Sequence, residues 1–365
     1  MEEAIELLPY ANAMNFIELA NSIWKKAPSG IDSETAFSFC VTNAEIRDTI
    51  PPKVDYVRNG MIGPAFSTYM SQPHLGFFQS DKCYALLYGV TNEGSSVLAT
   101  VHGFRPWLRF MIKGQTSPKT ILSLLTDEDD DDGGSNSDDR NGVKRSEVKM
   151  DVSNSTLAYG YDPHGEYKCV MLTFSTVRAY WKTRKNFERC TLPDVEIEEK
   201  IDLIAQWEAV TGLRPCYWAK LGKVKHAGNY RISHSAIEVE CGIEDLQVLM
   251  DAQGMPESAI PNQLSWSFDG EMWSESGGFP DKHLDNDVVC ALSMDAKWSK
   301  EKSRTKVVIC MGRCKPLPGI VVLCVKTEKE VIDGFRDLLV LTCPQFLASF
   351  NGLGFDWPYV AERAK

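Results

Sequence analysis

Alternation of apolar and polar positions predicts β-strands over much of the chain from about residue 80 onward. Apolar runs at residues 83–90 and 96–101 flank a short polar stretch with a glycine, which predicts a hairpin. Further strands are predicted at residues 108–112, 167–173, 233–240, 288–294, 306–311 and 319–325. The pattern as a whole predicts a strand-rich α+β protein.

Helical spacing of apolar residues is confined to fewer segments. Residues 11–26, 177–189 and 196–211 have this spacing. A further helix is predicted after Thr327, because Thr327 and Glu330 form a capping box ahead of an apolar face. From residue 288 the predicted order is therefore three strands, a helix, a strand and a helix.

Composition sets the class of the protein. The chain has 365 residues, 43% hydrophobic and 24% charged, which is typical of a folded protein with about two domains. No apolar run approaches the ~20 residues that span a bilayer, so we expect no membrane partner. The acidic N-terminus argues against a secretory or mitochondrial leader. Eleven scattered cysteines predict reduced thiols in an intracellular compartment. Cys310 and Cys314 are predicted to be a pair of partly buried thiols, because no second pair or His cluster completes a zinc site.

The net charge of −11 is concentrated in one segment. Residues 127–139 hold eight acidic groups, which leaves 39 basic against 42 acidic residues (50 less 8) in the remainder. A solvated, disordered insertion at 126–147 is favoured over a DNA mimic, because the segment has no apolar residue to bury. Overall charge therefore neither supports nor excludes a nucleic-acid partner.

The most informative string is Phe-Asn-Gly-Leu-Gly-Phe-Asp-Trp-Pro-Tyr-Val at residues 350–360. Asp356 is expected where a short strand turns into a helix, since Pro358 suits a first helical turn. A carboxylate at such a junction can hold a divalent cation through oxygen. The alternative is an ordinary turn in which a solvated Asp caps the helix.

This string resembles the second exonuclease motif of the family B DNA polymerases, Asn-x-x-x-Phe-Asp. Its Trp-Pro-Tyr ending is found in eukaryotic replicative, delta-like members and in those of large DNA viruses. Residues 89–107 are similar to the start of that family's N-terminal domain. The resemblance implies a mainly β polymerase-type N-terminal domain followed by a truncated ribonuclease-H-like α/β exonuclease domain.

Three segments follow from this resemblance. We expect a poorly readable leader at residues 1–79 and the polymerase-type N-terminal domain, with its acidic insertion, at residues 80–287. A partial 3′–5′ exonuclease domain is expected at residues 288–365.

The resemblance also implies which carboxylates would hold metal. The first strand of the exonuclease fold supplies Asp-x-Glu in this family, and we place it at Asp295-Ala296-Lys297. Asp295 and Asp356 are thus the expected catalytic residues and ligands, with Mg²⁺ or Mn²⁺ if the chain is active and no cofactor otherwise. Lys297 opposes this, because an ammonium repels cations where a carboxylate is expected. Glu301 and the Asp285–Asp287 pair lie beyond the strand ends and offer no substitute.

Nucleic-acid contacts are implied for two residues of the string. Asn351 would contact the DNA strand, although it could equally be a turn residue accepting backbone bonds, and Phe355 would support the loop. The family's third exonuclease motif, Tyr-x-x-x-Asp, and its palm motifs are expected beyond Lys365.

The favoured hypothesis is the N-terminal and exonuclease portion of a family B DNA-directed DNA polymerase in DNA replication, truncated and inactive alone. A non-catalytic nucleic-acid-binding or interaction module is the alternative, and a stand-alone exonuclease is a third hypothesis. The expected partners are single-stranded or primer-template DNA, the remaining polymerase domains and replication factors, in the nucleus or at a viral replication site.

Overall fold

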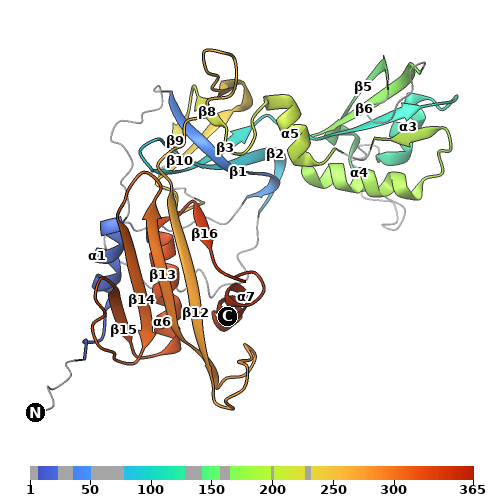
Figure 1. Ribbon diagram of the computed structural model, residues 1–365. Coiled ribbons are helices and arrows are strands. Elements are labelled where there is room, and N and C mark those ends of the chain that lie inside the picture. Colours follow the sequence, from blue (N-terminus) through green and yellow to red (C-terminus); the bar gives the residue numbers. More distant parts are fainter. Residues whose placement is uncertain are drawn as a thin grey trace, which may run out of the picture.

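The computed structural model describes residues 7–23, 36–50, 78–127, 142–156, 165–198, 201–226 and 232–365. Residues 128–141 of the disordered insertion expected at 126–147 lie outside the described residues. The ends of that range are ordered, because Thr126 is buried and Val143 packs in the core of the four-stranded lobe. Three sheets of seven, four and five strands form three lobes (Figure 1). The mixed, strand-rich α+β class predicted from the sequence is confirmed. Within the described ranges, every helix is too short or too polar to cross a membrane.

The seven-stranded sheet has the order β11-β8-β1-β2-β3-β10-β9. The predicted hairpin is present: β2 and β3 pair antiparallel, and the Thr91 N–H donates to the Ser95 carbonyl at 2.9 Å across the turn. β10 returns from far along the chain to pair parallel with β3. The strands are β1 (Phe37–Ile50), β2 (Phe78–Val90), β3 (Ser96–His102), β8 (Trp218–Leu221), β9 (Lys225–His226), β10 (Ile237–Gly242) and β11 (Leu246–Val248).

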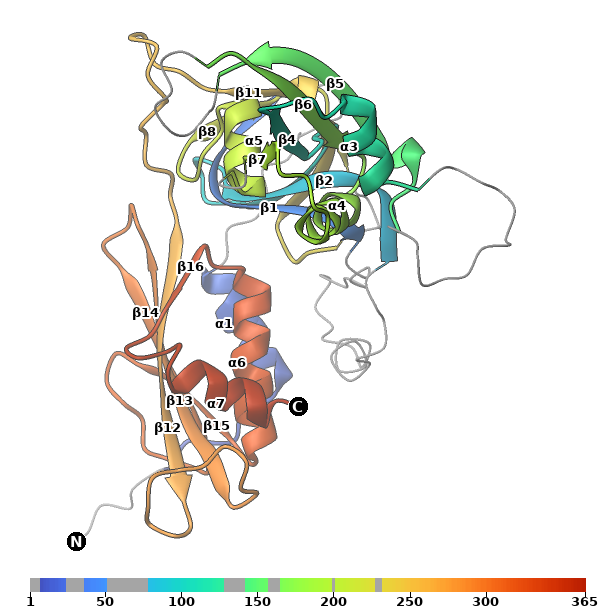
Figure 2. The ribbon, with the colours of Figure 1, turned by 90° about the vertical axis from the view of Figure 1, so that its right-hand side faces the viewer.

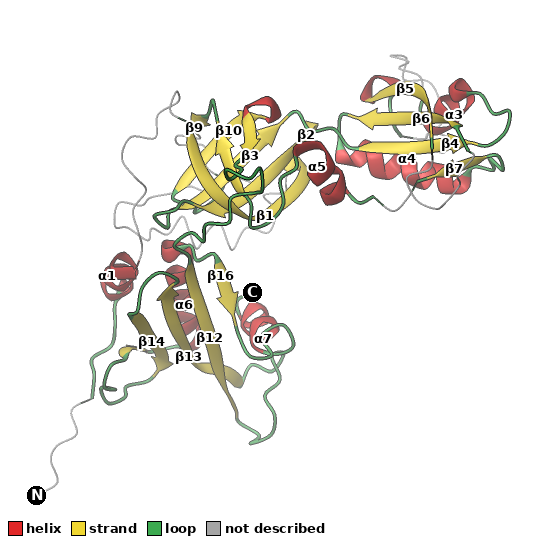
Figure 3. Cartoon of the chain, turned by 45° about the horizontal axis from the view of Figure 1, so that its top comes forward, coloured by secondary structure: helices red, strands yellow, loops and turns green. Residues whose placement is uncertain are grey.

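The four-stranded sheet, in the order β5-β6-β4-β7, forms a small lobe with two helices (Figure 3). Its helix α4 has the predicted bounds of 177–189. The helix predicted at 196–211 is shorter, because residues 195–197 pair with β4 and Asp202 caps a later start. The elements are β4 (Trp107–Ile112), α3 (Pro118–Leu125), β5 (Val148–Ser155), β6 (Tyr167–Phe174), α4 (Val177–Arg189), β7 (Val195–Ile197) and, following it, α5 (Leu203–Thr211).

The five-stranded sheet has the order β15-β14-β13-β12-β16. β12, β13 and β14 form an antiparallel meander, whereas β16 pairs parallel with β12. Helices α1, α6 and α7 lie on one face of this sheet (Figure 2), and their apolar residues share one core with it. The elements are α1 (Ala13–Ile23), β12 (Leu264–Ser274), β13 (Asp287–Trp298), β14 (Arg304–Met311), β15 (Val321–Val325), α6 (Glu328–Thr342), β16 (Phe346–Ala348) and α7 (Asp356–Arg363).

The expected domain boundaries at residues 79 and 287 differ from this architecture. The five-stranded sheet begins with β12, which pairs with β13 along its whole length, so its first strand precedes residue 287. The segment expected as a leader also contributes structure to two lobes: α1 packs against the five-stranded sheet, and β1 pairs with β2. Sequence spacing could not show these partners, because both contacts join segments far apart in the chain.

The turn of the β2–β3 hairpin contacts the five-stranded lobe. The Lys300 ammonium donates to the Asn92 side-chain oxygen at 3.0 Å, and the Asn262 N–H donates to the Asn92 carbonyl at 3.3 Å. Gly94 has φ +106°, and a Cβ there would lie 2.5 Å from the Trp298 ring. A glycine at this turn thus permits both the backbone conformation and the close approach of the two lobes.

The docking of α1 on α6 gives a first testable prediction. A Cβ on Gly334 would lie 2.4 Å from the Phe16 ring, because the two helices meet closely there. We expect Gly334→Ala to lower the free energy of unfolding by about 1–3 kcal/mol through overpacking. At a helical position with free space around it, the same Gly→Ala change would instead raise the free energy of unfolding by about 1 kcal/mol. Urea unfolding of the full chain measures the effect.

Two variants serve as controls for this test. Lys329→Ala, on an exposed part of α6, should change stability by less than about 0.5 kcal/mol. Adding Phe16→Leu to Gly334→Ala should recover part of the loss, because the smaller side chain relieves the contact. A Gly334→Ala protein as stable as the parent, with unchanged amide exchange in α1, would contradict the observed packing.

Candidate metal and nucleic-acid site

Asp356 occupies the junction predicted from the sequence. β16 ends at Ala348, a loop follows, and α7 begins at Asp356 with Pro358 in its first turn. The Asp356 side chain is 4% exposed, and its Oδ2 accepts a hydrogen bond from the Ser349 hydroxyl at 2.9 Å. A carboxylate at a helix N-terminus is also stabilised by the helix dipole. The local prediction of a strand, a turn and a helix is therefore confirmed.

The edge of β12 lies next to Asp356. β16 pairs with β12 only at residues 265–267, so it leaves the next part of this edge to the loop and α7. A Cβ on Gly270 would lie 3.4 Å from Asp356 Oδ1, which shows how closely the carboxylate approaches the strand. Gly270 is flanked by Asp269 and Glu271, both exposed. An Asp-x-Glu sequence on the first strand therefore borders the buried Asp356.

Alternation along β12 gives these two carboxylates a common face. Leu264, Trp266 and Phe268 are buried in the core beneath α6, so the odd-numbered residues face the other side of the sheet. Asp269 and Glu271 thus project together from the open face. Gly270 lies on the other, helix-covered side of the strand, and Asp356 approaches it from there, so the oxygens of Asp269, Glu271 and Asp356 do not all lie within 4.8 Å of one another.

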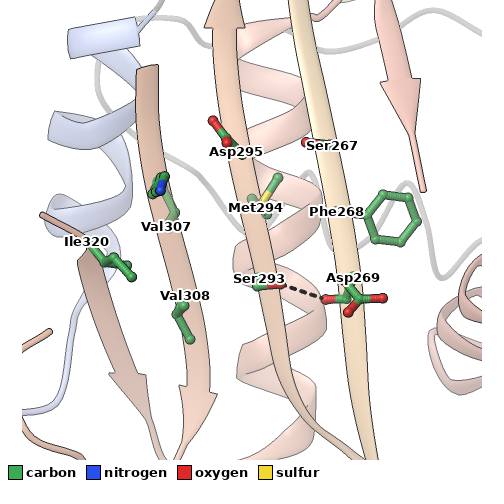
Figure 4. Close-up of a pocket in the computed structure, with 10 residues that line it drawn as sticks. Ser267, Phe268, Asp269, Ser293, Met294, Asp295, Val307, Val308 and Ile320 are labelled. Atoms are coloured by element: carbon green, nitrogen blue, oxygen red, sulfur yellow. Dashed lines mark hydrogen bonds between the residues drawn. The ribbon is translucent and has the colours of Figure 1, made fainter. Parts of the chain in front are cut away.

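Asp295 lies on the neighbouring strand and lines one pocket together with Asp269. It is on β13, the second strand, opposite Ser267, and its Oδ2 accepts a hydrogen bond from Arg304 at 2.8 Å. Figure 4 shows it in a pocket of about 260 Å³ on the open face. Because β12 separates β13 from β16, the structure does not bring Asp295 beside Asp356. The guanidinium of Arg304 already balances its charge, which disfavours a metal there.

The interpretation of Lys297 changes with this topology. Lys297 is exposed on β13 and pairs across the sheet with Ser265 and Arg304. It is expected at the Glu position of Asp-x-Glu if β13 is the first strand of the exonuclease fold. In the structure β12 precedes β13 and pairs with it in the same sheet. The spacing of an Asp-x-Glu sequence occurs on β12 at Asp269 and Glu271.

A sequence signal for this strand was present. Residues 264–268 alternate strictly as Leu-Ser-Trp-Ser-Phe, and the Asp-Gly-Glu that follows matches the spacing expected of the first exonuclease strand. The signal was missed because these residues were assigned to the interior of the preceding domain. What sequence spacing alone could not supply was the proximity of Gly270 to Asp356, which lies 86 residues further along the chain.

The two residues expected to contact nucleic acid shape the loop before α7. Asn351 has φ +55° and is exposed, and its carbonyl accepts hydrogen bonds from the N–H groups of Gly354 and Phe355 at 2.9 and 3.0 Å. This is the turn role that the sequence left open as an alternative. The half-buried Phe355 ring lies 4.9 Å from the Phe279 ring and 5.5 Å from the Tyr359 ring, so it packs the loop against its surroundings.

The same loop exposes large apolar side chains. Phe350 is 94% exposed and Leu353 is 90% exposed, a few residues from the buried carboxylate of Asp356. Trp357, in the first turn of α7, is also exposed. Exposed aromatic and apolar side chains at one loop can stack with bases or contact a partner.

α7 is held in place by contacts at both of its ends. The Tyr359 hydroxyl donates to the Asp287 carbonyl at 3.0 Å, which ties the helix to the start of β13. Near its C-terminal end, Arg363 forms an ion pair with Glu328 of α6 at 2.7 Å and donates to the Leu284 carbonyl at 2.9 Å. These bonds position the N-terminus of α7, and hence Asp356, against β12.

Comparison with known proteins gives this arrangement a context. Residues 198–365 match the family model described as DNA polymerase family B, exonuclease domain. The chain is a relative of the family B DNA polymerases. It is 22% identical over 293 residues to the DNA polymerase delta catalytic subunit of Bos taurus, with 76% of this chain and 26% of that protein covered.

Other relatives show similar coverage. The Dictyostelium discoideum delta catalytic subunit is 25% identical over 76% of this chain and 26% of its own length. The DNA polymerase catalytic subunit of human herpesvirus 8 type P is 27% identical over 48% of this chain and 17% of its own length. The family B DNA polymerase structure from Pyrobaculum calidifontis aligns with a TM-score of 0.53 at 18% identity, over 90% of this chain and 32% of that one. The chain thus spans about a quarter of the length of the delta subunits, and the structural likeness shows the fold.

The β12–β13 turn near α7 gives a prediction on pH dependence. The Asp281 N–H donates to Asp287 Oδ2 at 2.8 Å and lowers the pKa of Asp287 below its ordinary value. A lowered folded-state pKa stabilises the protein above the unfolded pKa of about 3.9, and this contribution is lost as pH falls through the folded pKa. We therefore expect Asp287→Asn to lower Tm near neutral pH and to flatten the decline of Tm as the pH falls below about 4.

Thermal unfolding followed by circular dichroism measures this dependence. The control variant Asp285→Asn, two residues away, should show the same decline of Tm at acid pH as the parent. Identical acid profiles for the parent and Asp287→Asn would show that the Asp281–Asp287 bond contributes nothing to stability.

Proposed function

We propose that this chain is the N-terminal and exonuclease region of a DNA polymerase of family B type. In this proposal the edge formed by β12 and α7 binds a divalent cation and the end of a DNA strand. The observation that carries the proposal is the approach of Asp356 Oδ1 to within 3.4 Å of the Cβ position of Gly270, which stands between Asp269 and Glu271 in the sequence. Exonuclease domains of this family use divalent metal ions, which hard carboxylate oxygens bind well.

The residues present fit such a cation. Asp269 and Glu271 offer exposed oxygens, Asp356 offers a buried one, and the missing side chain at Gly270 leaves Asp356 access to the strand edge. The proposed ligands are thus Asp269, Glu271 and Asp356, in place of the Asp295 and Asp356 pair. Mg²⁺ and Mn²⁺ are the proposed ions, because oxygen-rich sites favour them over softer metals. When bound, such an ion would stabilise negative charge on a phosphate.

The loop before α7 supplies the contact surface for nucleic acid in this proposal. The exposed Phe350 and Leu353 stand in the loop that leads into Asp356, where a base at a strand end could stack. Asn351 sets the turn that presents them, and Phe355 packs the loop. Single-stranded DNA is therefore the proposed ligand of this edge.

We further propose that the 365-residue chain binds DNA without cutting it. Two-metal hydrolysis needs several carboxylates around two cations. The resemblance implies four, and the proposed set of Asp269, Glu271 and Asp356 supplies three within these 365 residues. The complete family activity, with its replication partners in a nucleus or at a viral replication site, is proposed only for an assembly with the remaining polymerase domains. A non-catalytic nucleic-acid-binding module is the second candidate, favoured by the exposed Phe350 loop.

Cation binding distinguishes the proposed ligands Asp269, Glu271 and Asp356 from the pair Asp295 and Asp356. We expect Asp269→Asn, Glu271→Gln and Asp356→Asn each to weaken Mn²⁺ binding by at least about tenfold, because each removes a charged ligand. Asp295→Asn should leave the affinity within about twofold, since Asp295 pairs with Arg304 on another strand. Electron paramagnetic resonance of free Mn²⁺ in titrations of the full chain measures both.

Lys297→Glu sharpens this test. If β13 were the metal strand, the variant would restore an Asp-x-Glu sequence and raise Mn²⁺ affinity. We expect no change, because Lys297 lies on the second strand. A loss of binding in Asp295→Asn together with normal binding in Asp269→Asn would overturn the proposed ligand set.

DNA binding gives an independent test. We expect Phe350→Ala and Leu353→Ala to weaken binding of a fluorescent single-stranded oligonucleotide, with about 1–3 kcal/mol lost if a base stacks on Phe350. Met255→Ala, which removes an exposed side chain from another lobe, is the matched control and should have no effect. Fluorescence anisotropy at several salt concentrations also reports the phosphate contacts, because counterion release makes affinity fall with salt.

The same samples test for cleavage. Shortening of the oligonucleotide in Mg²⁺ or Mn²⁺ that Asp269→Asn abolishes would establish an active exonuclease and refute the proposal of binding alone. Equal affinity of the parent and Phe350→Ala would remove this loop from the DNA site.

A further inference from the structure

Three cysteine thiols meet at the far edge of the five-stranded sheet, away from the carboxylates. Cys310 lies near the end of β14, Cys314 in the following loop and Cys324 in β15. Their sulfur atoms are 3.9 Å apart for Cys310–Cys314 and Cys310–Cys324, and 4.0 Å apart for Cys314–Cys324. The three thiols thus form a nearly equilateral triangle.

This triangle has the dimensions of a thiolate metal site. Thiolates bind tetrahedral Zn²⁺ at about 2.3 Å, so two sulfurs on one zinc lie about 3.8 Å apart. Among the described residues, these cysteines are the group whose potential ligand atoms all lie within 4.8 Å of one another. A disulfide would need sulfurs about 2.05 Å apart, which none of the three pairs approaches.

A backbone donor faces the triangle. The Cys314 N–H points at the Cys324 sulfur at 3.4 Å, and N–H donors of this kind stabilise a metal-bound thiolate. Cys324 is buried, whereas Cys310 and Cys314 are half-buried, so an ion can reach the triangle from the Cys314 side.

We propose that Cys310, Cys314 and Cys324 bind one Zn²⁺, with the fourth coordination position open to water or an external ligand. Three protein ligands with an open fourth position are an established zinc arrangement. Soft thiolates select zinc over Mg²⁺ or Mn²⁺, so this site is chemically distinct from the carboxylate edge. The proposal does not depend on the function proposed above.

The site would also fasten the N-terminal segment to the sheet. The Leu8 N–H donates to the Cys314 carbonyl at 3.0 Å, and the Ala11 N–H donates to the Cys324 carbonyl at 2.7 Å. Arg313 donates to the Leu7 and Leu8 carbonyls at 2.6 and 2.8 Å. A metal joining the three cysteines would hold the backbone that receives this segment, and with it the approach to α1. Zinc is therefore expected to raise the stability of the lobe.

Zinc content of the full chain, purified under reducing conditions, tests the proposal. We expect about one Zn²⁺ per chain by mass spectrometry, and Co²⁺ substitution should give the thiolate-to-cobalt charge-transfer absorption of a tetrahedral site. Cys314→Ser, at the least buried of the three thiols, should weaken Zn²⁺ binding by at least about tenfold in chelator competition.

Matched variants keep the result interpretable. Cys290→Ser removes a half-buried thiol on β13 that is not part of the triangle, and it should bind zinc as the parent does. Circular dichroism of Cys314→Ser establishes that the variant is folded. Zinc binding that persists unchanged in folded Cys314→Ser would overturn the proposal. The same holds for absence of charge-transfer absorption in cobalt-loaded protein, or for a failure of freshly reduced protein to bind Zn²⁺.

Discussion

The parallel pairing of β16 with β12 is the constraint on which the candidate site depends. Only three residues of each strand take part, at 346–348 and 265–267. Because the pairing is short, the chain leaves the sheet early and α7 can begin beside the exposed edge of β12. The close approach of Asp356 to Gly270 follows directly. A longer β16 would cover the edge with backbone hydrogen bonds and displace the helix N-terminus from the Asp-x-Glu sequence.

The helices that cover the other face of the sheet keep this edge in place. Trp266 is fully buried, and its indole N–H donates to the Thr342 hydroxyl at 2.9 Å, which links β12 to the end of α6. The Trp298 N–H donates to the Ile23 carbonyl at 2.9 Å and links β13 to α1. Each tryptophan combines a large buried area with one satisfied polar group, so it fixes both packing and orientation. The open face is thereby left to the carboxylates and to the pocket at Asp295.

Opposite edges of one sheet carry two different chemistries. Carboxylate side chains lie where β12 meets α7, and three thiols meet where β14 meets β15 and the N-terminal segment. The order of the strands keeps the two groups apart, because β13 and β14 lie between the two edges. The two proposed cations would therefore be selected independently, since hard oxygen and soft sulfur ligands compete poorly for the same ion.

Local sequence determined much of this protein. Alternating residues predicted the β2–β3 hairpin, helical spacing predicted α4 with its bounds, and the Thr327–Glu330 capping box marked the start of α6, because each signal depends on neighbours a few residues apart. The string at 350–360 indicated the related family and the junction at Asp356. Tertiary structure alone decided where the carboxylates and thiols lie: it paired β12 with β13 and β16, put Asp295 on β13 with Arg304, and brought Cys324 to Cys310 and Cys314. The physical reason is the same in each case, since strand order and register join residues across long stretches of chain and no local spacing encodes that distance.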